Sequence, residues 1–100
     1  MAERNLREKN IEGYLRDKVR DAGGIAYKWE SPGNNGVPDR IVMLPNARDV
    51  FVELKAPGKN PTPLQLSQHR RLRALGRDVR VIDSREQVDQ LLADYQEGRL

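Results

Sequence analysis

Three charged residues near the middle of the chain have the types and spacing that could support metal-assisted chemistry. Asp39 ends a loop, and Glu53 and Lys55 lie two positions apart in an otherwise apolar run. Carboxylates are typical ligands of hard divalent cations such as Mg²⁺, which also take waters and substrate phosphate oxygens. Such an ion can activate a water molecule, while a nearby lysine holds that water or stabilises the scissile phosphate. The residue types therefore indicate phosphate-ester chemistry if the fold brings them together.

The elements predicted around these residues would bring them together. Strands are expected at 40–44 and 50–55, and the short segment PNARD between them predicts a hairpin. The start of the first strand then lies beside the end of the second, so Asp39 should lie close to Glu53 and Lys55. Because residues two apart in a strand project from one face, Glu53 and Lys55 share a face.

An ordinary salt bridge on a solvated face is the alternative interpretation of Glu53 and Lys55. If helices cover both faces of the sheet, however, the two charges are partly buried and need partners or a metal. The expected position of Asp39 beside them favours a converging site over a surface pair.

The rest of the chain predicts a single α/β domain spanning residues 1–100. Apolar residues at helical or alternating spacing, with glycine and proline between the runs, indicate the elements. These are a helix over about 3–22, strands at 25–29, 40–44 and 50–55, a helix over about 63–75, a strand at 79–82, and a helix after Ser84. The order α-β-β-β-α-β-α predicts a mixed β-sheet flanked by helices.

The composition indicates a soluble globular protein that is mildly basic. Of the 100 residues, 37% are hydrophobic and 33% are charged, and the net charge is +3. No apolar run approaches the roughly 18 residues of a membrane span, and the N-terminus MAERNLREKN lacks the apolar core of a secretion signal. We therefore expect no membrane association and a cytoplasmic location. Because cysteine is absent, disulfides and thiolate metal sites are excluded.

Three motifs carry a resemblance to a known family. Gly36-Val-Pro-Asp39, Glu53-Leu-Lys55 and Thr62-Pro-Leu-Gln65, in this order within a small α/β domain, resemble the VRR-Nuc (virus-type replication-repair nuclease) family of the PD-(D/E)xK nuclease superfamily. The resemblance covers most of the chain and is closest in kind to the stand-alone virus-type members. It implies a restriction-endonuclease-like fold and a phosphodiesterase that acts on DNA with Mg²⁺ or Mn²⁺. Like those members, the protein would be a homodimer that cuts branched DNA such as Holliday junctions, in a bacterium or a phage-infected cell.

The resemblance also implies the residues of a site. The implied metal ligands are Glu12, Asp39, Glu53 and the backbone carbonyl of Leu54. The implied catalytic residues are Asp39, Glu53, Lys55 and Gln65. Among them, Lys55 would position and activate water, and Gln65 would orient the lysine or the scissile phosphate.

Structural alternatives exist for the residues on the helices. Glu12 borders the apolar stripe beside Leu15 and could be a surface residue of the helix. The same helix also carries the acidic residues Glu3, Glu8 and Asp17. Gln65 stands at capping-box spacing from Thr62, and Gln68 is a second candidate for its active-site role. His69, the only histidine, is predicted to be an exposed helix residue rather than a catalytic base.

Candidate DNA-contacting residues lie on the loops and on the basic helix: Ser31, Asn34, Arg40, Lys59 and Arg70. Turn formation is an alternative explanation for Ser31 and Asn34. At the level of the whole protein, the alternative to a nuclease is a non-catalytic DNA-binding module that retains the fold. A small structural protein would leave the charged strand face unexplained.

Overall fold

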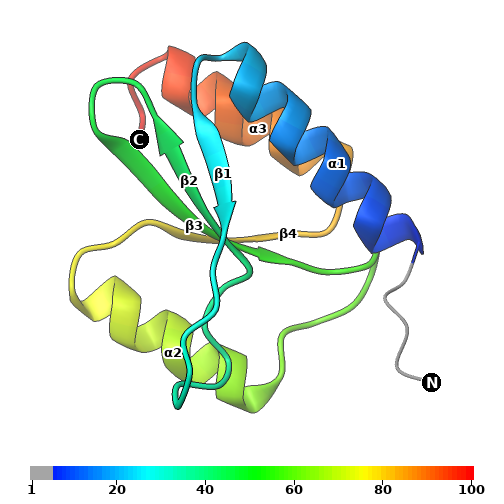
Figure 1. The fold of residues 1–100 in the computed structure, drawn as a ribbon, viewed down its shortest axis with the longest axis vertical. Helices are drawn as coiled ribbons and strands as arrows, with labels where there is room; N and C mark the ends of the chain where they lie inside the picture. Colours follow the sequence, from blue (N-terminus) through cyan, green and yellow to red (C-terminus); the bar gives the residue numbers. More distant parts are fainter. Residues whose placement is uncertain (1–5) are drawn as a thin grey trace.

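The computed structural model of the chain describes residues 6–100, which form one sheet flanked by helices (Figure 1). The elements are α1 (Leu6–Asp21), β1 (Ile25–Lys28), β2 (Arg40–Leu44), β3 (Arg48–Leu54), α2 (Pro63–Ala74), β4 (Val79–Ile82) and α3 (Arg85–Gln96). This order and the mixed sheet confirm the predicted fold class. The predicted start of the first helix, at Glu3, lies outside the described residues.

The four strands lie in the order β1-β2-β3-β4. β1, β2 and β3 are antiparallel neighbours, whereas β3 and β4 are parallel and are connected through α2. The predicted hairpin is confirmed: Leu44 pairs with Arg48, and the turn between them has positive φ angles of 68° at Asn46 and 57° at Ala47. Because the turn occupies only residues 45–47, strand pairing extends up to it, and β3 begins at Arg48, two residues before the predicted start.

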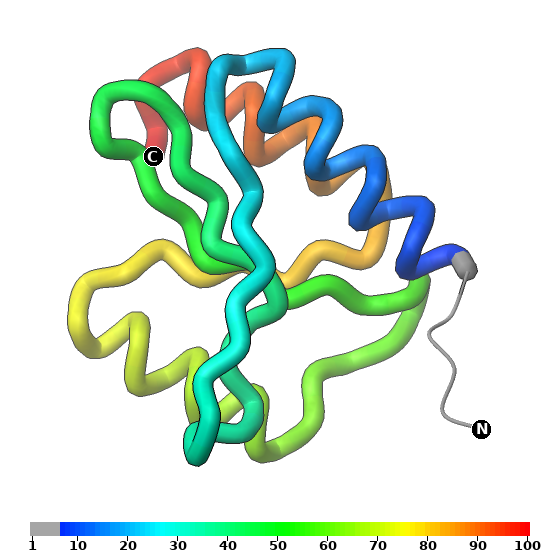
Figure 2. The backbone as a smooth tube through the Cα atoms, in the orientation of Figure 1, coloured from blue at the N-terminus to red at the C-terminus, as the bar shows by residue number. Residues whose placement is uncertain are grey.

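The hydrophobic core lies between one face of the sheet and the two helices α1 and α3. Val50, Val52 and Leu54 of β3 are buried in one cluster with Leu15 of α1 and Leu91 of α3. α2 lies on the opposite side of the sheet, and the course of the chain from β3 through α2 to β4 can be followed in Figure 2. Val50, Val52 and Leu54 therefore face α1 and α3, and Glu53, which alternates with them along the strand, faces the α2 side.

The loop that leads into β2 is held against α2. Gly36 has a φ of +90°, and a Cβ at this position would lie 3.0 Å from the carbonyl oxygen and Cγ of Leu64. Gln68 donates a hydrogen bond to the Asn35 carbonyl at 3.2 Å, and Pro38 is fully buried. Only glycine combines this backbone conformation with such close approach, so Gly36 helps to fix the loop that ends at Asp39.

Ser31 and Asn34 form a turn in the same loop. The Asn34 backbone N–H donates to the Ser31 carbonyl at 2.9 Å, and the Asn34 amide donates to Ser31 Oγ at 3.0 Å. The turn that the sequence offered as an alternative is therefore present.

None of the described helices has the length and hydropathy that crossing a membrane requires.

Candidate active site

The register of the β2–β3 hairpin places Asp39 beside Glu53. Arg40 pairs with Val52, so Asp39, one residue earlier, lies opposite Glu53 at the end of the ladder. Asp39 Oδ2 accepts a hydrogen bond from the Leu54 backbone N–H at 2.7 Å, and the carboxyl groups of Asp39 and Glu53 are hydrogen-bonded to each other. The two acidic residues therefore meet, as the hairpin predicted, although 14 positions separate them in the sequence.

Glu53 is a buried residue and not part of a surface salt bridge. Its side chain is only 1% exposed. The pKa of Glu53 is raised to about 9, first by burial and then by the hydrogen bond and the negative charge of Asp39, while the positive charge of Lys55 opposes the shift. The alternative of a solvated ion pair is wrong, because α2 covers this face of β3. A pKa raised to this extent favours the protonated form of Glu53 at neutral pH in the metal-free protein.

Two neighbouring carboxyl groups, with Glu53 buried and Asp39 partly buried, fit a divalent cation. An ion can replace the proton and neutralise both groups, since metal ligands must be deprotonated to bind. Among residues 6–100 no three His, Asp or Glu side chains are grouped as a ready cation site. Mg²⁺ commonly binds through one or two carboxylates, with waters and substrate phosphates filling its other positions. Asp39 and Glu53 match that pattern.

The raised pKa of Glu53 predicts that the metal-free protein becomes less stable as pH increases. Between the ordinary value of 4.5 and the folded-state value of about 9, folded Glu53 keeps a proton that the unfolded chain has released. Its contribution to stability is therefore complete below the lower value and is lost as pH approaches the upper one. Melting temperatures in EDTA, measured across this range, should fall less steeply in Glu53→Gln, which cannot ionise. An unchanged slope in that variant would contradict the assignment.

His69 is also part of this buried cluster. It is fully buried, and its Nε2 lies 3.1 Å from Glu53 Oε1. Burial lowers the pKa of His69, and the positive charges of Arg73 and Lys55 lower it further, so the imidazole is neutral at physiological pH. The prediction of an exposed helix residue is wrong.

The sequence carried a signal for the burial of His69. Gln65, Gln68, His69 and Leu72 follow the spacing i, i+3, i+4, i+7, and all four are at least partly buried on α2. Such a stripe marks the inner face of an amphipathic helix. Because polar residues occupy three of the four positions, a search for apolar periodicity alone does not detect this stripe.

Glu12 and Arg40 form a buried ion pair that connects α1 to the sheet. Arg40 donates to Glu12 Oε2 from Nε at 3.0 Å and approaches it with Nη2 at 2.8 Å. A third nitrogen, Nη1, donates to the Ala26 carbonyl of β1 at 2.9 Å. Glu12 is thus not a surface residue. Arg40 is only 9% exposed. Because its guanidinium binds Glu12 and the Ala26 carbonyl in the interior, it does not present a DNA-contacting group at the surface.

A different acidic residue of α1 acts on the site. The negative charge of Glu8, one turn before Glu12, contributes to the raised pKa of Glu53. Figure 2 shows the chain after β3 passing close to the first turn of α1, where Arg7 and Ile11 line a groove together with Pro57. The sequence could not choose between Glu8 and Glu12, because the choice depends on how α1 is rotated on the sheet.

The remaining predicted residues lie around this cluster. Gln65 forms a capping box with Thr62: its Oε1 accepts the Thr62 N–H at 2.9 Å, and its own N–H donates to Thr62 Oγ1 at 3.2 Å. The capping interpretation is confirmed, and Gln68 is held by the loop contact described above. Lys59 and Arg70 are exposed, Lys59 in the loop between β3 and α2 and Arg70 within α2.

The chain is similar to proteins named as nucleases. Over 83 residues it is 58% identical to Putative nuclease p44 of Acyrthosiphon pisum secondary endosymbiont phage 1, a match that covers 83% of this chain and 89% of that protein. A solved structure named VRR_NUC domain superposes with a TM-score of 0.83 at 36% identity, covering 89% of this chain and 97% of the other. No family model matches the chain.

Proposed function

The chain belongs to the VRR-Nuc family of nucleases, and from this premise we propose that it is a Mg²⁺- or Mn²⁺-dependent endonuclease that cuts branched DNA, such as Holliday junctions, as a homodimer. The observation that supports metal dependence best is the meeting of Asp39 with the buried Glu53 at the end of the β2–β3 ladder, beside Lys55. A protein that only bound DNA would gain nothing from two carboxyl groups turned toward a polyanion.

In this proposal each group has a separate task. Asp39 and Glu53 hold the ion together with the backbone carbonyl of Leu54, and the Leu54 N–H keeps Asp39 in place through its 2.7 Å hydrogen bond. The bound ion would lower the pKa of a water molecule and offset the charge that develops on the phosphate. Lys55 is half-buried directly after β3 and would hold the attacking water or stabilise the scissile phosphate.

For the acidic residue on α1, Glu8 is a second candidate beside Glu12, and neither is grouped with Asp39 and Glu53 as a ready three-residue cation site. The negative charge of Glu8 contributes to the raised pKa of Glu53, whereas Oε2 of Glu12 is held by two nitrogens of Arg40. Gln65 keeps its proposed role in orienting Lys55 or the scissile phosphate, from the first turn of α2.

The DNA would approach the side of the molecule where α2 and the loop before β2 meet. The proposed phosphate contacts are Ser31 and Asn34 of that loop, Lys59 before α2, and Arg70 on α2. Cationic and hydrogen-bonding groups of this kind position a protein on the phosphate backbone without reading the bases.

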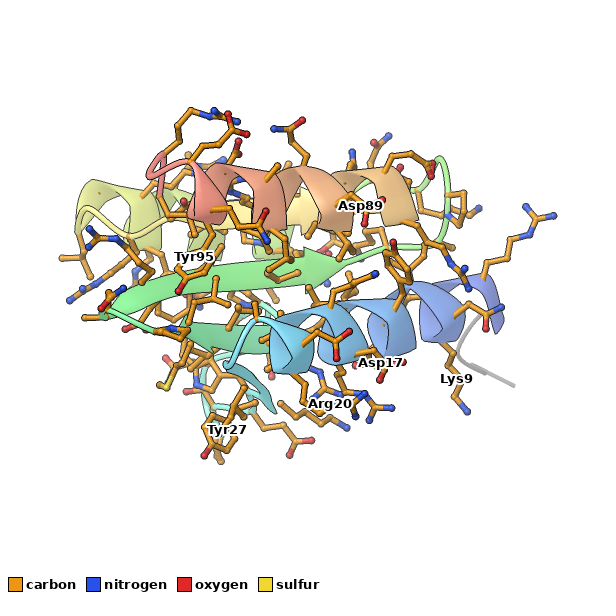
Figure 3. The ribbon with its side chains drawn as sticks, turned by 90° about the horizontal axis from the view of Figure 1, so that it is seen from above. Lys9, Asp17, Arg20, Tyr27, Asp89 and Tyr95 are labelled. Atoms are coloured by element: carbon orange, nitrogen blue, oxygen red, sulfur yellow. The ribbon has the colours of Figure 1, made fainter. Side chains whose placement is uncertain are left out.

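The proposed homodimer has a candidate surface on the sheet. Ile25 and Tyr27 of β1 and Met43 of β2 are large hydrophobic side chains with exposures of 52%, 53% and 43%, and Ile25 is paired with Met43. Figure 3 shows Tyr27 projecting outward from the β1 side of the molecule. Exposed apolar patches of this kind mark interaction sites. Light scattering should give a dimer mass for the wild type and a monomer mass for Tyr27→Lys, and a monomeric wild type would contradict the proposal.

The function is tested by incubating the purified protein with labelled linear, flap and four-way-junction DNA in Mg²⁺, Mn²⁺ or EDTA. We expect cleavage of the branched substrates with either metal and none in EDTA. The Asp39→Asn variant should be inactive under every condition, because it removes one of the two charges that bind the ion. Binding that persists in EDTA without cleavage in metal would instead establish the non-catalytic module.

A further inference from the structure

We propose that His69 is a positioning residue for the metal site: its Nε2–H holds Oε1 of Glu53 and thereby directs the other carboxylate oxygen toward Asp39 and the ion. This inference rests on the proposed metal-dependent function and adds to it a residue on α2. It concerns the geometry of Glu53 and gives His69 no contact with the substrate.

The geometry of the pair is that of a buried, directed hydrogen bond. His69 Nε2 and Glu53 Oε1 are 3.1 Å apart, and the exposures of the two side chains are 0% and 1%. The residues come from different elements, α2 and β3, so the contact also joins the helix to the strand that carries the site. Solvent cannot replace this hydrogen bond, because neither partner is reached by water.

The position of the imidazole proton follows from the other ring nitrogen. Nδ1 of His69 is buried and has no hydrogen-bond partner among the described residues. A proton on Nδ1 would create a buried N–H without an acceptor, which is more costly than a lone pair without a donor. The proton therefore lies on Nε2, and His69 donates to Glu53 Oε1. Oε2 remains as the oxygen that can bind the ion.

This arrangement excludes two other roles for His69. The imidazole does not act on the substrate as a general base, since Nε2 is occupied by Glu53 and Nδ1 is enclosed. It is also not a metal ligand, because the nitrogen that faces the site carries the proton. What remains is the support of a ligating carboxylate, and loss of such support typically weakens metal binding by about 10- to 100-fold.

Two variants separate hydrogen bonding from packing. His69→Met fills similar space without a donor, whereas His69→Gln keeps an N–H at the end of the side chain. Mn²⁺ binding to the DNA-free protein, measured by isothermal titration calorimetry, should be about 10- to 100-fold weaker in His69→Met and close to wild type in His69→Gln. Equal, wild-type-like affinity in both folded variants would overturn the positioning role. Absence of Mn²⁺ binding in the wild type would instead overturn the proposed function.

A second measurement needs no variant. Because His69 is the only histidine, long-range ¹H–¹⁵N NMR spectra of the tag-free wild-type protein report on this ring alone. In EDTA we expect the proton on Nε2 and a bare Nδ1, and addition of Mg²⁺ should shift the Nε2 resonance as Glu53 becomes a ligand. A proton on Nδ1 in the metal-free protein would overturn the inference, whether or not the variants fold.

Discussion

Replacing Lys55 with alanine is expected to lower the rate of DNA cleavage by about 10²- to 10⁴-fold, the usual effect of removing a group that assists proton transfer or stabilises the transition state. Lys55 lies at the end of β3, two residues from Glu53 and on the same face. Its positive charge acts to lower the pKa of both Glu53 and His69, so we expect the lysine to act at this cluster. The rate of cleavage of a four-way junction at saturating Mn²⁺ measures the effect.

The distinguishing feature of this variant is that metal binding should survive. Lys55 is not a ligand, so calorimetry should still detect Mn²⁺ binding to Lys55→Ala, whereas Asp39→Asn should lose binding and cleavage together. Lys9→Ala is the matched control: this exposed lysine lies on α1 (Figure 3), and its loss should leave the rate near that of the wild type. If Lys55→Ala cuts as fast as the wild type, the catalytic role of the lysine is wrong.

Arg40→Met is expected to destabilise the fold by about 3–5 kcal/mol, the usual cost of removing one partner of a buried ion pair. Glu12 and Arg40 side chains are each only 11% exposed. Without the guanidinium, the buried Glu12 carboxyl group loses its contacts with two nitrogens of Arg40, and the Ala26 carbonyl loses its donor. Urea denaturation monitored by circular dichroism gives the change in the free energy of unfolding.

Two comparisons show whether burial is the cause. The double variant Glu12→Met/Arg40→Met should recover much of the lost stability, because replacing a buried pair by apolar side chains is often neutral. Arg20→Met removes an ion pair that is 72% and 61% exposed at Arg20 and Asp17, on the outer surface of α1 (Figure 3), and should cost about 0–1 kcal/mol. A loss of similar size in Arg20→Met and Arg40→Met would contradict this explanation.

The features that the sequence predicted correctly depend on local rules. The five-residue segment PNARD between two apolar runs predicts a hairpin, and the hairpin register alone brings Asp39 opposite Glu53. Likewise, Thr62 and Gln65 stand at the spacing of a capping box, and the capping box is present. Turn length, strand alternation and capping are properties of short segments, so they can be read without knowing what packs on them.

The tertiary structure decided which charged groups are buried and which partners they have. The sequence by itself determined the α-β-β-β-α-β-α order and the meeting of Asp39 with Glu53. The contact of His69 with Glu53, the pairing of Glu12 with Arg40, and the influence of Glu8 on the site were set only by packing. The physical reason is that rotating a helix by one residue moves a side chain by about 100° around its axis. The rotation of α1 and α2 is set by packing against the whole core, and apolar periodicity alone did not specify it, since three of the four inward positions of α2 are polar.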